Sequence, residues 1–166
     1  MPDLRWLEGY SGESAVELIA LEGKCRIDSL VFAFEQAMNQ KAARVGKDRL
    51  TPEERIVLAI ESLEREVNNG GYDQFFANSS REYATMIVDA LRIIGCPKTA
   101  SITRKALDIV QDSPMAVADI ENGTWEENED RRDALGECDS HYYEGAENIG
   151  ESLFAFIKEN RARIEP

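Results

Sequence analysis

The sequence has little histidine and cysteine, which many enzymes and metal sites use. Its 166 residues include one histidine, three cysteines and five prolines. It contains no P-loop, no GxSxG or HExxH motif and no dinucleotide-binding GxGxxG motif. His141 lies three residues after Cys138, but a structural zinc site needs about four protein ligands. We therefore predict a protein that is not an enzyme and has no catalytic residue, metal or cofactor.

Long apolar segments are also missing. No stretch approaches the roughly 18 apolar residues that a membrane span requires, and the first residues lack a basic start followed by an apolar run. Cys25, Cys96 and Cys138 are odd in number and widely spaced, which is typical of buried, reduced thiols. We expect a cytoplasmic protein without a membrane partner.

Basic residues are scarce relative to acids. Nineteen Lys and Arg face thirty-two Asp and Glu, which gives a net charge of −13. Residues 108–151 hold fourteen acids and two bases, a net charge of −12, which leaves −1 for the rest of the chain. Such a surface repels nucleic acid and attracts basic partners. We expect no direct binding to nucleic acid.

Helix start signals between residues 51 and 111 indicate an all-α fold. Thr51 can cap a helix, Pro52 suits the first helical position, and Glu54 completes a capping box. Asn69, Gly70 and Gly71 are expected to end this helix.

The same signals recur further along the chain. Ser79 and Glu82 predict a second capping box, and Gly95 is expected to end the helix that this box opens. Pro97 then predicts the start of a third helix.

Upstream, Asp28 is expected to cap a helix, and a shorter helix is expected from Ser14 to Leu21. Residues 112–130 read as a long loop, because proline, glycine and acids interrupt any periodic pattern. The predicted fold is an all-α, single-domain bundle of about six to eight helices with short connections and one long acidic loop. Residues 1–47 are expected to form a helical extension packed on a domain of residues 48–166.

Two rows of residues at helical spacing run through the C-terminal part of the chain. The first row, in which six of seven residues are acids, is Asp130, Asp133, Glu137, His141, Glu144, Glu147 and Glu151. The second row is apolar and is expected to face the core: Leu135, Cys138, Tyr142, Ala146, Ile149 and Leu153. Gly145 predicts a break into two helices.

The acids of the first row, together with acids of the preceding loop, are the candidate partner-binding surface. The loop acids are Asp119, Glu121, Glu126, Glu127 and Glu129. One helical turn rises about 5.4 Å, whereas a DNA strand presents a phosphate about every 3.4 Å. One row is too sparse to imitate DNA, so loop acids or a second subunit must contribute. Solubility and calcium binding by the loop remain alternatives for the same residues.

The string EVNNGGYDQFFAN, residues 66–78, is the most distinctive in the chain. Its glycines permit a left-handed exit from a helix, and its rings can supply core contacts, so a structural corner is one interpretation. The other is a binding pocket with exposed rings beside Asp73 and Gln74. The residues of this corner are Asn69, Gly70, Gly71, Tyr72, Gln74, Phe75, Phe76 and Asn78.

Three stretches of the sequence together resemble the DNA mimic protein family over roughly residues 48–163. They are LTPEERIVLAIESLEREVNNGGYDQFFANSS, RIIGCP and, matching more loosely, ECDSHYYEGAENIGESLFAFIKEN. The resemblance implies an all-helical fold and a homodimer. For the family's named member it also implies acids that imitate DNA phosphates and occupy a transcription regulator. We therefore expect an acidic interaction protein whose partner is a basic DNA-binding protein. The alternative is a protein-binding module that uses the EVNNGGYDQFFAN corner, with the acidic face serving solubility.

Overall fold

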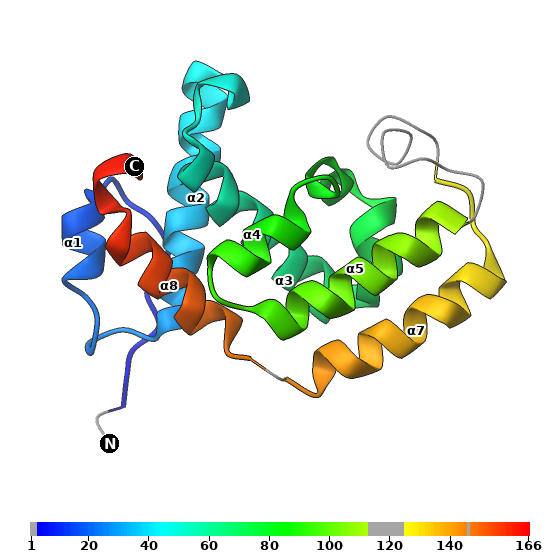
Figure 1. The fold of residues 1–166 in the computed structure, drawn as a ribbon. Coiled ribbons are helices and arrows are strands. Elements are labelled where there is room, and N and C mark those ends of the chain that lie inside the picture. The colour runs from blue at the N-terminus through cyan, green and yellow to red at the C-terminus, as the bar shows by residue number, and fades with distance from the viewer. Residues whose placement is uncertain (1–2, 113–124, 146) are drawn as a thin grey trace. The chain divides into compact units, whose positions relative to one another are not determined.

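The computed structural model describes residues 3–112, 125–145 and 147–166 (Figure 1). Among these residues there are seven α-helices, three short 3-10 helices and no β-strand, so the all-α prediction is confirmed. The α-helices are α1 (Ala15–Ile19), α2 (Ile27–Val45), α3 (Pro52–Ala77), α4 (Ile87–Ile93), α5 (Pro97–Asp112), α7 (Glu129–Tyr143) and α8 (Ile149–Glu159). The 3-10 helices are Lys47–Arg49, Ser79–Tyr83 and Arg161–Arg163.

The chain divides into two units, which we call unit 1 and unit 2. Unit 1 comprises Met1–Glu61 and Ile149–Pro166, and unit 2 comprises Ser62–Asn148. The long helix α3 contributes residues 52–61 to unit 1 and residues 62–77 to unit 2. The expected division at residue 47 stays a prediction.

In unit 1, α2 packs against α1 and α8 (Figure 1). The core between these helices includes Leu18, Phe34 and Phe154, which are almost fully buried. The expected short helix is confirmed as α1. Its start at Ser14 is a capping box, in which the Glu17 amide donates to Ser14 Oγ at 3.3 Å and the Ser14 amide donates to Glu17 Oε2 at 2.7 Å.

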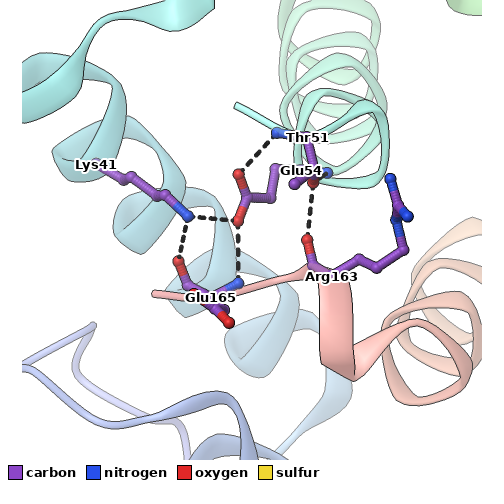
Figure 2. A network of polar contacts seen from close by, with 5 residues as sticks. All are labelled: Lys41, Thr51, Glu54, Arg163 and Glu165. Atoms are coloured by element: carbon purple, nitrogen blue, oxygen red, sulfur yellow. Dashed lines mark hydrogen bonds and ion pairs between the residues drawn. The ribbon is translucent and has the colours of Figure 1, made fainter. Parts of the chain in front are cut away.

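A buried carboxyl anchors the start of α3 in unit 1, and Figure 2 shows it among its partners. The Glu54 side chain is fully buried and accepts from Lys41 Nζ at 2.7 Å, the Glu165 amide at 3.0 Å and the Thr51 amide at 3.0 Å. Thr51 Oγ1 accepts from the Glu54 amide at 3.1 Å and donates to the Arg163 carbonyl at 2.7 Å. The predicted capping box is therefore confirmed, and it also holds the C-terminal residues of unit 1.

The prediction that Asp28 caps α2 is wrong by two positions. The residue at the cap is Arg26, which makes no side-chain cap bond, and Asp28 lies in the first turn. Asp28 pairs there with Arg26 at 2.6 Å and accepts from the Ser29 amide at 3.0 Å. An acid in the first turn still favours the helix start, because it faces the positive end of the helix dipole.

The prediction that Ser79 and Glu82 open an α-helix is also wrong. Ser79–Tyr83 is a 3-10 helix, and α4 begins only at Ile87. Ser80 Oγ donates to the Phe75 carbonyl at 2.8 Å, which ties this segment to the end of α3. The end of α4 agrees with the prediction, because Gly95 has φ +85° and Pro97 starts α5.

In unit 2, α5 packs against both α4 and α7, and Figure 1 shows α5 and α7 running side by side. The predicted break in α3 is present, because Gly70 and Gly71 depart from helical geometry, with φ −155° and +78°. Beyond the break, Tyr72, Phe75 and Phe76 are fully buried. The change of chain direction at Gly70 and Gly71 thus places these three aromatic rings in the core of unit 2.

All three cysteines, Cys25, Cys96 and Cys138, are buried, as predicted, and their thiols are free. Within the described ranges, no helix has both the length and the apolar character that a membrane crossing needs.

Candidate partner-binding surface

Helix α7 carries four of the nine described candidate acids, and three more lie within three residues of its ends. The Asn128 side chain caps it by accepting from the Arg131 amide at 2.9 Å. Glu129 and Asp130 occupy the first turn, where the helix dipole favours negative charge. Acids therefore suit the start of this helix locally, whatever else they do.

The acids that lie exposed on α7 and in the residues next to it form one group, which we call the α7 acidic surface. Its members are Glu126, Glu127, Glu129, Asp130, Asp133, Glu137 and Glu144. Of these described acids, only Glu127 makes an ion pair, with Arg132 at 3.5 Å. The surface thus presents largely uncompensated negative charge.

Four of the predicted acids are not assigned to the α7 acidic surface, and Glu147 is one of them. Asp119 and Glu121 fall outside the described residues. Glu151 is exposed at the start of α8, which belongs to unit 1. The predicted break near Gly145, which has φ +68°, is confirmed between α7 and α8.

Glu147 has a structural role that the sequence pattern did not reveal. Its carboxylate accepts from the Lys98 amide, the Thr99 amide and Thr99 Oγ1 at 2.8 to 2.9 Å, and so caps the start of α5. Partial burial raises the pKa of Glu147, but these hydrogen bonds outweigh it and hold the pKa below its usual value. A carboxylate committed in this way is poorly placed to bind a partner.

The two bases of the acidic segment are held against the protein. Arg131 is buried, stacks over the Trp125 ring at 3.8 Å and donates to the Glu126 carbonyl. Arg132 is about half exposed and lies 3.8 Å from Asp73, besides its contact with Glu127. Among the described residues, neither base makes an ion pair with Asp133, Glu137 or Glu144.

The inner face of α7 confirms the predicted apolar row. Leu135, Cys138 and Tyr142 are buried, as are Ile149 and Leu153 in α8, while Ala146 is not described. Burial raises the pKa of the Cys138 thiol, so this residue behaves as a core side chain.

Two acids that the sequence analysis did not select lie on the inner side of α7. Asp139 accepts from the Tyr72 amide at 2.7 Å, and partial burial raises its pKa. Glu64 of α3 accepts from the Tyr142 hydroxyl, and burial raises its pKa to about 7. Helical spacing could have found both, because Asp139 lies four residues after Leu135 and Glu64 four residues after Ile60, within apolar rows.

The glycine at position 71 makes the contact between α3 and α7 possible. A Cβ atom built on Gly71 would lie 2.3 Å from Asp139 Oδ2, and φ of +78° already excludes most side chains. The same turn aims the Tyr72 hydroxyl at Thr103 Oγ1 of α5, 2.7 Å away. The glycine pair is therefore needed for packing within unit 2.

The EVNNGGYDQFFAN corner is structural, as the first interpretation held. Its three rings are fully buried, so a pocket with exposed rings is not formed. Trp125 stacks on Phe76 at 5.9 Å, and both Gln74 and Asn78 donate to Glu66 Oε2 at 2.8 Å. Asn69 and Gly70 are exposed at the bend.

A family model described as DMP19-like protein matches residues 48–160. The chain belongs to this family. The match includes α3, α4, α5, α7 and α8, so the α7 acidic surface lies within the DMP19-like region, whereas α1 and α2 precede it. The comparisons with curated proteins and with solved structures gave no match.

Within the described part of this DMP19-like chain, no group of three or more His, Cys, Asp or Glu side chains is arranged to hold a metal ion. The calcium hypothesis depended partly on Asp119 and Glu121, which lie outside that part. It stays an untested alternative.

Proposed function

We propose that this protein is a non-enzymatic interaction protein whose α7 acidic surface binds the basic surface of a DNA-binding protein in place of DNA. Membership of the DMP19-like family supports the proposal. The observation that carries it is the group of exposed acids on α7, of which only one makes an ion pair among the described residues.

The charge density points to the start of α7 as the centre of binding. At a rise of about 1.5 Å per residue, Asp130 and Asp133 are separated by about 4.5 Å along the helix axis, and Glu137 and Glu144 by about 10.5 Å. A DNA strand has a phosphate about every 3.4 Å along its own axis, so the first pair comes closer to that spacing. Glu126, Glu127 and Glu129 add charge beside Asp130. Because Glu147 caps α5, the density of available negative charge is lower still beyond the C-terminal end of α7.

Stability alone gives a poor reason for such a surface. Like charges one helical turn apart oppose helix formation by roughly 0.2 to 0.5 kcal/mol per pair. A basic partner would relieve this repulsion, and release of its bound anions would make the association salt-dependent.

We also propose a cytoplasmic homodimer. A second copy would double the number of acids offered to a partner, and three buried free thiols suit a reducing compartment. Sedimentation equilibrium tests the dimer, and a single species at the mass of one chain would contradict it.

The test begins with capture of partners from the source cells at low salt, followed by elution at high salt. Each eluted DNA-binding protein is then bound to its own DNA in a gel-shift assay, and this protein is added. We expect release of the DNA at low salt and no release at high salt. Failure to release DNA from any eluted regulator would contradict the proposal.

Two variants with the same change in total charge assign the effect to α7. The first replaces Glu126, Glu127 and Glu129 with Gln and Asp130 with Asn. The control neutralises four exposed acids outside the α7 acidic surface: Asp3→Asn, Glu8→Gln, Asp89→Asn and Glu159→Gln. We expect the first variant to lose DNA release and the control to keep it. Equal behaviour would assign the acids to solubility.

The alternative, a protein-binding module at the EVNNGGYDQFFAN corner, is not favoured, because the rings it depends on are buried.

A further inference from the structure

Three side-chain hydrogen bonds attach the inner face of α7 to α3 within unit 2. The Tyr142 hydroxyl donates to the Glu64 carboxyl, and the Tyr143 hydroxyl donates to the Val67 carbonyl. The Asp139 carboxylate accepts from the Tyr72 amide at 2.7 Å. In two of these three hydrogen bonds the acceptor is therefore a carboxyl group.

The Glu64 carboxyl has an unusual setting for an acid. It is largely buried, and no described Lys or Arg makes an ion pair with it. Burial raises its pKa to about 7, so the charged form is disfavoured while α7 is in place. Its attachment is a neutral hydroxyl, which does not neutralise a negative charge.

The other titratable groups around this contact come from three elements. Helix α7 supplies Tyr142, Cys138 and Asp139, the segment after the α3 break supplies Tyr72, and α5 supplies Lys105, which acts on Cys138. The sole histidine of the sequence, His141, lies on the exposed side of α7.

We propose that the Glu64 carboxyl, enclosed between α3 and α7 without a described cation, is a protonation-dependent latch that holds α7 on α3 most tightly when it carries a proton and loosens as the pH rises. The Tyr142 hydrogen bond favours the ionised carboxylate and therefore limits this loosening. Gly145, with φ +68° directly beyond the end of α7, supplies a backbone position at which the helix can swing.

The direction follows from solvation of the carboxyl. With α7 attached, ionised Glu64 is held away from water, whereas with α7 detached it is solvated and ionises near the ordinary value of 4.5. Below about pH 4.5 both forms are protonated and the attachment is strongest. Between pH 5 and 8 the equilibrium constant for detachment should rise on the order of 10- to 100-fold.

The latch would make the α7 acidic surface depend on pH, because the acids of α7 move with the helix. This last consequence rests on the proposed function. The attachment itself does not, so the two can be tested separately.

Hydrogen exchange of the protein alone, followed by mass spectrometry from pH 5 to 8, tests the latch. After correction for the intrinsic pH dependence of exchange, we expect opening of α7 peptides to increase 10- to 100-fold in the wild type. Glu64→Gln, which keeps a neutral side chain of similar shape, should abolish the increase. The same increase in Glu64→Gln would overturn the proposal.

Two further variants separate the latch from other titrating groups. His141→Gln should keep the increase, and its loss there would assign the effect to the histidine. Tyr142→Phe removes a hydrogen bond to ionised Glu64, so the midpoint should move to higher pH. An unchanged midpoint would contradict the role of Tyr142. Because no partner is present, none of these results depends on whether the protein displaces DNA.

Discussion

Glu54 and Glu64 are two acids on the same helix, α3, of which the first is buried and the second partly buried, and their partners differ. In unit 1, Glu54 is fully buried and accepts from the Lys41 ammonium and two backbone amides. In unit 2, Glu64 is partly buried and its carboxyl accepts from the Tyr142 hydroxyl. The first setting suits a charged carboxylate, and the second favours a protonated one.

The comparison teaches that burial of an acid does not by itself define its role. A carboxylate with a cation and amide donors joins two parts of a unit through charge-assisted hydrogen bonds. A carboxyl without a cation makes the same kind of attachment depend on pH. The acids of the α7 acidic surface form a third class, because among these described residues only Glu127 makes an ion pair.

The largest effect is expected from Glu54→Ala. Removing this buried side chain takes away the carboxylate that accepts from the Lys41 ammonium and from two backbone amides, which should lower the free energy of unfolding by about 3 to 5 kcal/mol. Chemical denaturation checks the value. Arg55→Ala, an exposed change on the same helix, should cost less than about 0.5 kcal/mol. Similar losses in the two variants would break the comparison at Glu54.

The next largest effect is expected from Gly71→Ala, which tests the contact between α3 and α7 in unit 2. The new Cβ atom would collide with Asp139 Oδ2 and must adopt φ near +78°, so unfolding free energy should fall by about 2 to 3 kcal/mol. The matched control is Gly136→Ala in α7, where the Cβ atom meets nothing within 4 Å. That change should stabilise the helix by about 0.5 to 1 kcal/mol. A change in unfolding free energy in the same direction for both variants would contradict this explanation.

A smaller, pH-dependent effect is expected from Glu64→Gln. The pKa of Glu64 is about 7 in the folded chain and about 4.5 when unfolded, so its contribution to stability is lost as the pH rises through this interval. Relative to the wild type, the variant should gain about 2 kcal/mol of stability between pH 5 and pH 8. Denaturation curves at the two pH values measure this difference. The same difference between wild type and variant at both pH values would remove the contrast with Glu54.

The fold was largely predictable because its signals are local. Thr51, Glu54 and the Gly70–Gly71 pair fix the ends of a helix through bonds within a few residues, and the structure contains them all. The prediction from Ser79 and Glu82 was wrong because a capping-box sequence is also compatible with a 3-10 helix. The hydrogen bond from Ser80 Oγ to the Phe75 carbonyl stabilises that 3-10 helix.

The candidate site was predictable only in part. Periodicity separated the inner and outer faces of α7, since the spacing of Leu135, Cys138 and Tyr142 is intrinsic to a helix. It could not reveal that Glu147 caps α5, because Thr99 is distant in sequence and the contact depends on the fold. The pairing of Glu64 with Tyr142 was hidden for the same reason.

The exposed acids of α7 are expected to contribute least to stability and most to binding. The most direct test measures the affinity of an eluted DNA-binding protein for the wild type, the four-acid α7 variant and the four-acid control over a range of salt concentrations. The account predicts that log affinity falls steeply with log salt for the wild type and the control. For the α7 variant the slope should be shallower by roughly one unit for each acid lost from the interface. Identical slopes for all three proteins, with identical affinities at low salt, would contradict the central claim.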